Sequence, residues 1–456
     1  MNAMENTRID PAKLEMFETM PIPRAVLKNA LPAIAGMLMM LVYNLADTFF
    51  IAQTKNDLQV AAVSIAMPVF LIFMALGNML GAGGASVISR SLGAGRHEYA
   101  SKVSAFCMWA SIGLGALVSV IMWVFMTPLL GLIGTSSETA AFTRSYLTIV
   151  AFGGPMMLFA NCFSNIIRAE GQAASAMTGL LIGNCTNIVL DPVFILVFGM
   201  GITGAAVATI IGNALATVFY LQYFLRKKSS LSISPKKFTV GDKVLTGVIA
   251  IGLPASLGQL LMSVSQVFIN GLLAGYSDMA VAALGVAMRI GLINCTFCIG
   301  LGQGAQPLLG YCFGGRLLER YKGIFRFSML CAVVLAVTVT GLCYLFLEQI
   351  VGIFLTGEEA YALGLRFSRM ILSTCALFGA FFLITSALQA MGAAIPTFTI
   401  SISRQGIVFI PAIFILNALV GLNGLAWAQP AADLLSTILA AVMYVFVARR
   451  RIRMNS

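Results

Sequence analysis

The chain alternates between long apolar stretches and short polar connections. A helix of about 20 apolar residues crosses the roughly 30 Å hydrocarbon core of a bilayer, and each stretch is at least that long. The stretches are continuously apolar, whereas the strands of a membrane β-barrel alternate in polarity. The pattern predicts twelve membrane-spanning helices, at residues 29–53, 58–86, 101–127, 139–166, 174–198, 203–225, 244–274, 281–309, 323–347, 360–387, 396–419 and 423–447.

The two halves of the chain repeat one another, because residues 32–226 align with residues 254–447 at a nearly constant shift. The shared landmarks include Pro32 with Pro254, Gly81 with Gly302, Gly83 with Gly304, Gly93 with Gly314, and Gly171 with Gly392. Six spans fall in each copy, so both copies enter the membrane in the same direction. The expected fold is an all-α integral membrane protein with twelve transmembrane helices in two six-helix lobes related by pseudo-two-fold symmetry. That architecture is typical of transporters.

Polar segments and basic residues predict the domain organisation and the orientation. The predicted segments are a cytoplasmic N-terminal segment at 1–28, an N-lobe at 29–225, a cytoplasmic linker at 226–243, a C-lobe at 244–447 and a cytoplasmic basic tail at 448–456. Most of the 28 Lys and Arg residues lie on the face that holds the linker and both termini. That face is expected to be cytoplasmic, because basic residues are enriched there in membrane proteins.

Composition narrows the function classes further. Apolar residues make up 59% of the chain and charged residues only 10%, which fits a membrane protein. The net charge of +11 reflects the same basic bias, and no basic cluster interleaved with aromatic residues indicates nucleic-acid binding. The sequence has no G-x-x-x-x-G-K-[ST] motif, so an ion gradient is a simpler energy source than ATP. No histidine cluster, nucleophile elbow or metal-ligand spacing indicates an enzyme or a cofactor.

Three carboxylates are predicted well inside spans: Asp47, Asp191 and Asp433. Burying an ionised Asp at the membrane centre costs about 2.5–3.5 kcal/mol on insertion scales, so such residues are functional candidates. Asp433 has an expected partner in Arg404, and a structural ion pair is favoured there over a transport role. The roles of Arg404, Asp433 and Arg289, the other basic residue inside a predicted span, stay open.

Asp47 and Asp191 are predicted at similar depths near the outer ends of the first and fifth spans. Asn187 precedes Asp191 by one helical turn, which places both side chains on one helix face. Thr209 lies at a similar depth in the sixth span. Two carboxylates, an amide and a hydroxyl at one depth form a candidate site for a proton or a dehydrated Na⁺. Further polar residues of the same half are Asn44, Tyr146, Asn161, Asn165, Asn184 and Asn213.

The C-terminal copy lacks these carboxylates, since Phe268 replaces Asp47 and Ala412 replaces Asp191 when the repeats are aligned. A packing device would be expected in both copies, so the difference favours a function for the N-terminal site. The alternative is a hydrogen-bonded polar cluster that stabilises helix contacts. Pro32 interrupts the helix that carries Asp47, and the lost backbone hydrogen bond predicts a bend there.

The chain resembles the MATE family (multidrug and toxic compound extrusion) over about residues 20–450. The resemblance rests on Asp47-Thr48, Gly-Ala-Gly-Arg at 93–96, Arg168-Ala-Glu-Gly171, Asn187-Ile-Val-Leu-Asp191-Pro192 and Gly201-Ile-Thr-Gly204. The last two motifs resemble the branch that contains the DinF-like and MepA-like bacterial pumps. In that branch, the resemblance implies an N-lobe cation site formed by Asp47, Asn187, Asp191 and Thr209. It also implies that Pro32 is the bend of the first helix and that Tyr146 and Asn161 join the surrounding polar network.

The resemblance implies a secondary antiporter that exports organic, often cationic and amphipathic, compounds in exchange for H⁺ or Na⁺ by rocking of two lobes. Such a pump would act in the plasma membrane of a bacterium and support antibiotic resistance, without ATP, nucleic acid or a resident cofactor. The alternative is a lipid-linked oligosaccharide flippase of a related superfamily, which would favour extra spans and a cationic central cavity. The sequence does not identify the substrate, the coupling ion, the oligomeric state or the regulation.

Overall fold

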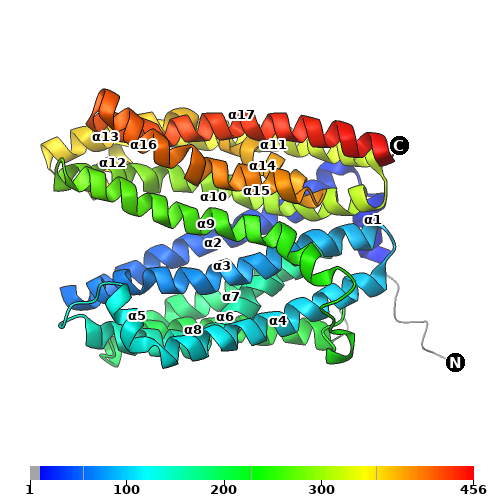
Figure 1. Cartoon of the computed structure of the whole chain (residues 1–456), viewed down its shortest axis with the longest axis horizontal. Coiled ribbons are helices and arrows are strands. Elements are labelled where there is room, and N and C mark those ends of the chain that lie inside the picture. The colour runs from blue at the N-terminus through cyan, green and yellow to red at the C-terminus, as the bar shows by residue number, and fades with distance from the viewer. Residues whose placement is uncertain (1–10, 55, 227–228, 356, 456) are drawn as a thin grey trace. The chain divides into compact units, whose positions relative to one another are not determined.

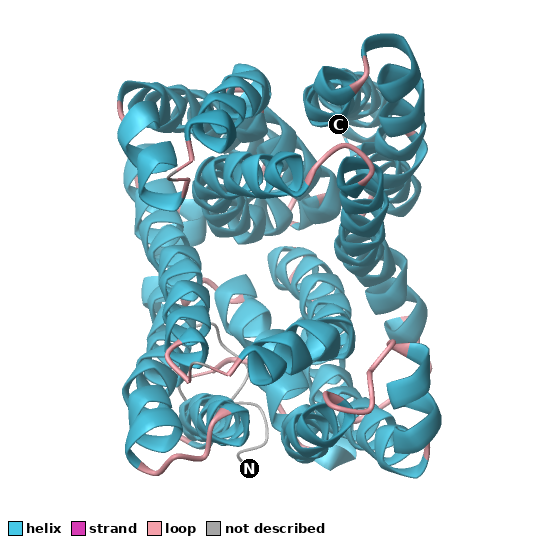
Figure 2. Ribbon diagram, turned by 90° about the vertical axis from the view of Figure 1, so that its left-hand side faces the viewer, coloured by secondary structure: helices cyan, strands magenta, loops and turns pink. Residues whose placement is uncertain are grey.

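The computed structural model describes residues 11–54, 56–226, 229–355 and 357–455, and the side chains at 11–13, 52, 57, 278 and 452–455 are not described. Parts of the predicted N-terminal segment, first outer connection, linker and basic tail therefore lie outside the described residues. Over the described ranges every regular element is a helix and no strand occurs, as Figure 2 shows.

Eleven described helices are long and apolar enough to cross a membrane, and a twelfth span consists of a bent pair. The spans of the first half are α2 (Ile22–Ala52), α3 (Asp57–Gly93), α4 (His97–Val124), α6 (Ala140–Ala169), α7 (Ala173–Pro192) continued by the π-helical turn η1 (Val193–Val197), and α8 (Ile202–Leu225). The spans of the second half are α9 (Val244–Ala274), α10 (Asp278–Gly314), α11 (Leu318–Leu345), the pair α13 (Glu358–Cys375) and α14 (Phe378–Ala390), α15 (Ala394–Ile402) with η3 (Ser403–Ile407) and α16 (Phe409–Val420), and α17 (Leu422–Asn455). The short helices are α1 (Pro11–Glu18), α5 (Met126–Leu132), η2 (Pro235–Lys237) and α12 (Leu347–Phe354), and Figure 1 labels the α-helices. The twelve predicted spans are confirmed, with α13 and α14 counted as one.

The internal repeat reappears in how the helices begin and end. Asn56 caps α3, because its side-chain oxygen accepts hydrogen bonds from the backbone amides of Leu58 and Gln59. Ser277, at the equivalent position of the second half, caps α10 in the same way. Gly201 and Gly421 precede α8 and α17 with φ of 56° and 65°, a backbone conformation that glycine adopts without strain. Matching caps and turns in the two copies fix matching helix ends.

The described chain forms two compact units, and two of the three boundaries between them fall inside helices. One unit contains the described part of Met1–Thr19 and Ala35–Gly252, and the other contains Met20–Ile34 and Leu253–Ser456. The start of α2 therefore belongs to the second unit and the start of α9 to the first. Both boundaries lie within three residues of a proline inside the helix, Pro32 or Pro254. Each helix continues through its proline, so the bend at Pro32 stays a prediction, as do the predicted segment boundaries.

Helix α6 is central to the first unit, where it contacts α3, α4, α7 and α8. Small residues allow the close approach: a Cβ atom at Gly115 of α4 would lie 2.6 Å from Cα of Pro155 on α6. Ser119 donates a hydrogen bond across the same interface to the carbonyl of Ala151, at 2.5 Å. In a membrane, such close van der Waals packing and interhelical hydrogen bonds hold helices together.

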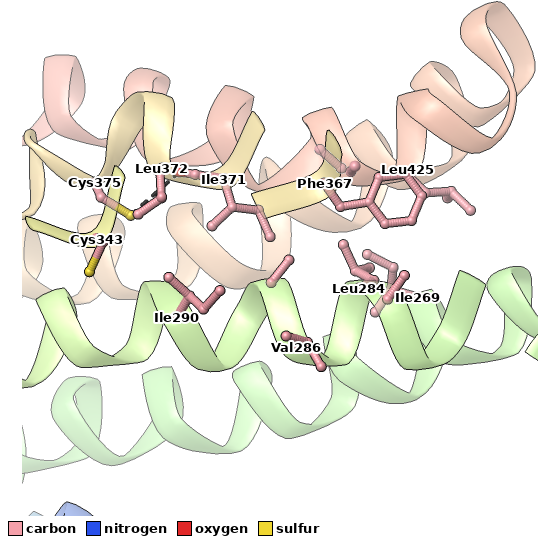
Figure 3. Close-up of a cluster of buried hydrophobic side chains, with 14 of the residues drawn as sticks. Ile269, Leu284, Val286, Ile290, Cys343, Phe367, Ile371, Leu372, Cys375 and Leu425 are labelled. Carbon is pink, nitrogen blue, oxygen red and sulfur yellow. Dashed lines mark hydrogen bonds between the residues drawn. The ribbon is translucent and has the colours of Figure 1, made fainter. Parts of the chain in front are cut away.

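Helix α10 has the corresponding position in the second unit, where it contacts α11, α13 and α14. Figure 3 shows Leu284 and Ile290 of α10 facing Phe367 and Ile371 of α13, and all four side chains are nearly completely buried. The helices of this half therefore pack around an apolar core of branched and aromatic side chains.

Candidate cation-coupling site

The site is built where α7 and α8 touch through their backbones. Gly183 of α7 and Gly212 of α8 face each other, and a Cβ atom at Gly212 would lie only 2.5 Å from the carbonyl oxygen of Gly183. The same Cβ would lie 3.5 Å from Cβ of Asn187. This short separation is possible because both residues are glycines. It brings the next turns of α7 and α8 within hydrogen-bonding distance.

Asn187, Asp191 and Thr209 form one buried hydrogen-bonded cluster at that contact, with exposed fractions of 2%, 0% and 6%. The amide of Asn187 is satisfied when its nitrogen donates to Oδ2 of Asp191 at 2.7 Å. Its oxygen then accepts from the hydroxyl and the backbone amide of Thr209, both at 3.0 Å. The second carboxyl oxygen of Asp191 has no hydrogen-bond partner among the described residues. An unpaired buried acceptor is costly, so this oxygen is available to a proton or a cation.

Asp47 brings a second carboxyl group to the cluster from α2. Its side chain lies close to the carboxyl group of Asp191, and the two groups interact. Two ionised carboxylates in contact repel each other, so the pair needs a shared proton or a cation bound by both. Asp47 is half-buried, whereas Asp191 is buried, which makes Asp47 the more accessible of the two groups.

Two tyrosines complete the surroundings of the carboxyl pair. Tyr146 of α6 is 8% exposed and lies close to both Asp47 and Asp191. Tyr43 lies one turn before Asp47 on α2, and its side chain interacts with those of Asp47 and Thr209. The sequence analysis did not select Tyr43, although its four-residue spacing from Asp47 was a usable signal.

The asparagines predicted around the site are placed differently. The side-chain nitrogen of Asn161 donates to the carbonyl of Met74 on α3, at 3.4 Å, and that of Asn165 donates to the carbonyl of Asn161, at 3.0 Å. Both amides thus belong to the α3–α6 interface and to the next turn of α6. Asn184 has a buried side-chain nitrogen without a partner among the described residues.

The second unit holds a different buried charge arrangement. Nε of Arg404, in the π-helical turn η3, lies 2.8 Å from Oδ1 of Asp433 on α17, so the predicted ion pair is present. Gln429 donates to the same oxygen at 2.9 Å. The Arg404 guanidinium lies 5.0 Å from the ring centroids of Phe378 and Phe381, in the geometry of cation–π contacts. This charge pair is compensated within the protein, unlike the carboxyl pair of the first unit.

A sequence profile of the MatE family matches the chain twice, over residues 32–193 and 254–415. The chain belongs to the MatE family. The two matches coincide with the two copies of the internal repeat, and together they cover most of the chain. The family consists of transporters, so this MatE chain is a multi-pass membrane transporter and not an enzyme.

Individual relatives agree with this family and with the branch predicted from the motifs. The multidrug export protein MepA of Staphylococcus aureus (strain MRSA252) is 31% identical over 447 residues, which are 97% of this chain and 98% of that protein. A solved structure of MATE in complex with MaL6 has a TM-score of 0.91 at 24% identity and covers 98% of this chain and 99% of its own. An outward-facing multidrug resistance MATE family transporter of the MOP superfamily has a TM-score of 0.90 at 24% identity with the same coverage. These structures confirm the predicted fold of twelve helices in two lobes.

Proposed function

We propose that this transporter exports organic compounds, often cationic and amphipathic, in exchange for H⁺ or Na⁺. The relationship to MepA over nearly the whole chain supports drug export. The contact between the carboxyl groups of Asp47 and Asp191 supports ion coupling, because such a pair needs a proton or a cation to be stable. Its oxygen donors, together with those of Asn187 and Thr209, suit H⁺ or Na⁺ and do not favour transition metals.

The coupling step follows from the charge of the pair. A cation that enters from outside reaches the half-buried Asp47 first and is then shared with the free oxygen of Asp191. Its binding cancels the repulsion between the two carboxyl groups and holds α2 against the α7–α8 pair. Release of the cation restores the repulsion, so the position of α2 depends on the occupancy of the site.

The two lobes are proposed to rock and so to expose the substrate path to each side in turn. In α2 and α9, the passage from one compact unit to the other lies beside Pro32 or Pro254. A proline leaves one helical hydrogen bond unmade, so bending costs less there than elsewhere in the helix. One charge that moves through a potential of 100 mV supplies about 2.3 kcal/mol, enough for a roughly 50-fold substrate gradient.

The proposed location is the plasma membrane of a bacterium, since the similar MepA proteins are bacterial. Both termini are assigned to the cytoplasm from the distribution of Lys and Arg. The flippase alternative is not supported by any specific observation, and the near-complete alignment with a drug exporter favours efflux.

Ethidium efflux from loaded vesicles tests the proposal, with a pH gradient and a Na⁺ gradient imposed separately. The wild-type protein is expected to respond to one gradient, which identifies the ion. Asp191→Asn is expected to abolish the gradient-driven part, because the substitution removes an ionisable carboxyl group and keeps its size. The control is the double substitution Arg404→Met with Asp433→Leu, which removes the buried ion pair of the other unit as a whole; rates are normalised to folded protein. Full gradient coupling in Asp191→Asn would refute the assignment of the site.

A further inference from the structure

A cavity with basic walls lies in the first unit, at the ends of three spanning helices. Its volume is about 290 Å³. The lining comes from the end of α3, the start of α4 and the start of α9, and consists of Val87, Arg90, Ser91, Arg96, Tyr99, Lys243, Thr246 and Gly247. Three of these residues are cationic, three carry hydroxyl groups and none is acidic. The cavity therefore favours an anion that accepts hydrogen bonds.

The arginines of the cavity are oriented by neighbouring groups. The Arg96 guanidinium lies 5.7 Å from the ring centroid of Tyr99, and its side chain is exposed at the rim. Nε of Arg90 donates to the carbonyl of Ser86 at 3.0 Å. The Arg96 guanidinium, held by one face, presents its N–H groups in a fixed fork, which matches the oxygen spacing of a phosphate group, and Arg90 adds positive charge to the wall of the cavity.

The third cation, Lys243, is placed by an unusual turn at the end of the linker. Asp242 and Lys243 have φ of 53° and 63°, a conformation that non-glycine residues rarely adopt and that tends to persist at functional sites. Asp242 pairs with Lys102 at 2.9 Å, so its charge is balanced by Lys102 and not by Lys243. The turn leads directly into α9, where Thr246 and Gly247 belong to the first turn, and the positive end of the helix dipole adds to the attraction for an anion.

The walls of the cavity are fixed by close packing. Gly83 of α3 faces the carbonyl of Val248 on α9, and Gly252 of α9 faces the carbonyl of Met79 on α3, with no space for a side chain at either glycine. The linker is held as well, because the ring of Phe238 stacks on Phe106 of α4 at 6.1 Å. A preformed cavity binds its ligand without the cost of ordering its walls.

We infer that this cavity binds the phosphate group of an anionic phospholipid. Three membrane-spanning helices end at the cavity, which puts it at the depth of the lipid headgroups on the side rich in basic residues. A free phosphate ion would make the same contacts, but anionic headgroups are far more concentrated at this depth. The inference goes beyond the proposed antiport and does not depend on which ion is coupled.

Lipid titration of the full-length protein in non-ionic detergent tests the inference, with native mass spectrometry as the readout. Phosphatidylglycerol is expected to bind and phosphatidylcholine to bind much more weakly. The double substitution Arg96→Gln with Lys243→Gln is expected to weaken phosphatidylglycerol binding about 25-fold, from about fivefold per basic residue at a membrane surface. The control pair, Arg449→Gln with Arg450→Gln, removes the same charge from exposed positions of the tail and is expected to change binding by less than about twofold.

A variant that keeps every charge makes the test independent of folding defects in the first pair. A Cβ atom at Gly247 would lie 3.5 Å from the side chain of Val87 and 4.0 Å from the hydroxyl of Tyr99, so Gly247→Leu fills the cavity without a backbone clash. Loss of phosphatidylglycerol binding in Gly247→Leu supports the inference. Equal losses in both charge pairs, or equal binding of phosphatidylcholine, would overturn it. Displacement of the lipid by inorganic phosphate would overturn the choice of a lipid and identify a soluble phosphate as the ligand.

Discussion

The contact between α7 and α8 can be broken by a single methyl group. In Gly212→Ala, the new Cβ atom would lie 2.5 Å from the carbonyl oxygen of Gly183, whereas ordinary contact begins at 3.4 Å. The carbonyl oxygen belongs to the backbone and a Cβ atom is fixed to its Cα, so neither can rotate away, and α8 must move by about 0.9 Å to restore ordinary contact. The hydrogen bonds between Asn187 and Thr209, now 3.0 Å long, would then exceed the distance at which a hydrogen bond is effective.

The expected cost of Gly212→Ala combines two effects. Overpacking of a tight interface costs about 1–3 kcal/mol, and each lost hydrogen bond adds about 1 kcal/mol. Thermal unfolding in detergent measures the loss of stability, and ethidium efflux measures the loss of ion coupling. Gly113→Ala is the matched control, because a Cβ atom there has no neighbour within 4 Å and alanine favours a helix. If Gly212→Ala unfolds and transports like the wild type, the backbone contact does not position the site.

Three further predictions concern a hydroxyl group, an ion pair and a backbone turn. Tyr43→Phe removes a hydroxyl that interacts with Asp47 and Thr209, and it is expected to weaken gradient-driven efflux, measured by dye transport. Arg404→Met leaves Asp433 buried without its ion-pair partner, which is expected to lower the free energy of unfolding by about 3–5 kcal/mol. The double variant Arg404→Met with Asp433→Leu is expected to recover most of this loss. A double variant as unstable as the single one would contradict the prediction. Gly95→Ala places a side chain at φ of 72° and is expected to lower the free energy of unfolding by about 1–2 kcal/mol, measured by thermal unfolding in detergent. Arg316→Gly, at the equivalent position of the second half with φ of 57°, is expected to lose no stability in that assay.

The sequence predicted those features that depend on local pattern. The spans follow from runs of apolar residues, and the two copies share caps at Asn56 and Ser277 because the same local hydrogen bonds end each connection. The contact between Asn187 and Asp191 was predictable because a four-residue spacing places both on one face of α7. The depth of Asp47 was predictable as well, but not its contact with Asp191, which depends on how α2 packs.

The features that the sequence did not predict depend on tertiary packing. The bend between α13 and α14 is 45°, yet the residues at the break, Ala376 and Leu377, are neither proline nor glycine. The break consists of one tightened turn, in which the amide of Leu377 bonds to the carbonyl of Thr374. Arg404 lies over Phe378, the first residue of α14, so the partner that accompanies the bend comes from another helix.

The two buried charge arrangements explain why ion coupling is assigned to the first unit. In the second unit, Asp433 is paired with an arginine, and a guanidinium does not lose its proton in proteins, so the pair is neutral without any bound ion. In the first unit, Asp47 and Asp191 interact with each other, and no basic side chain acts on either of them among the described groups. In the proposed mechanism their charge is balanced by a proton or a cation from solution, because the polar groups described around them are amides and hydroxyls. At the positions of Asp47 and Asp191 the second copy has Phe268 and Ala412, and its buried acid, Asp433, lies elsewhere with its own arginine, so we propose that only the carboxyl pair of the first unit needs an ion.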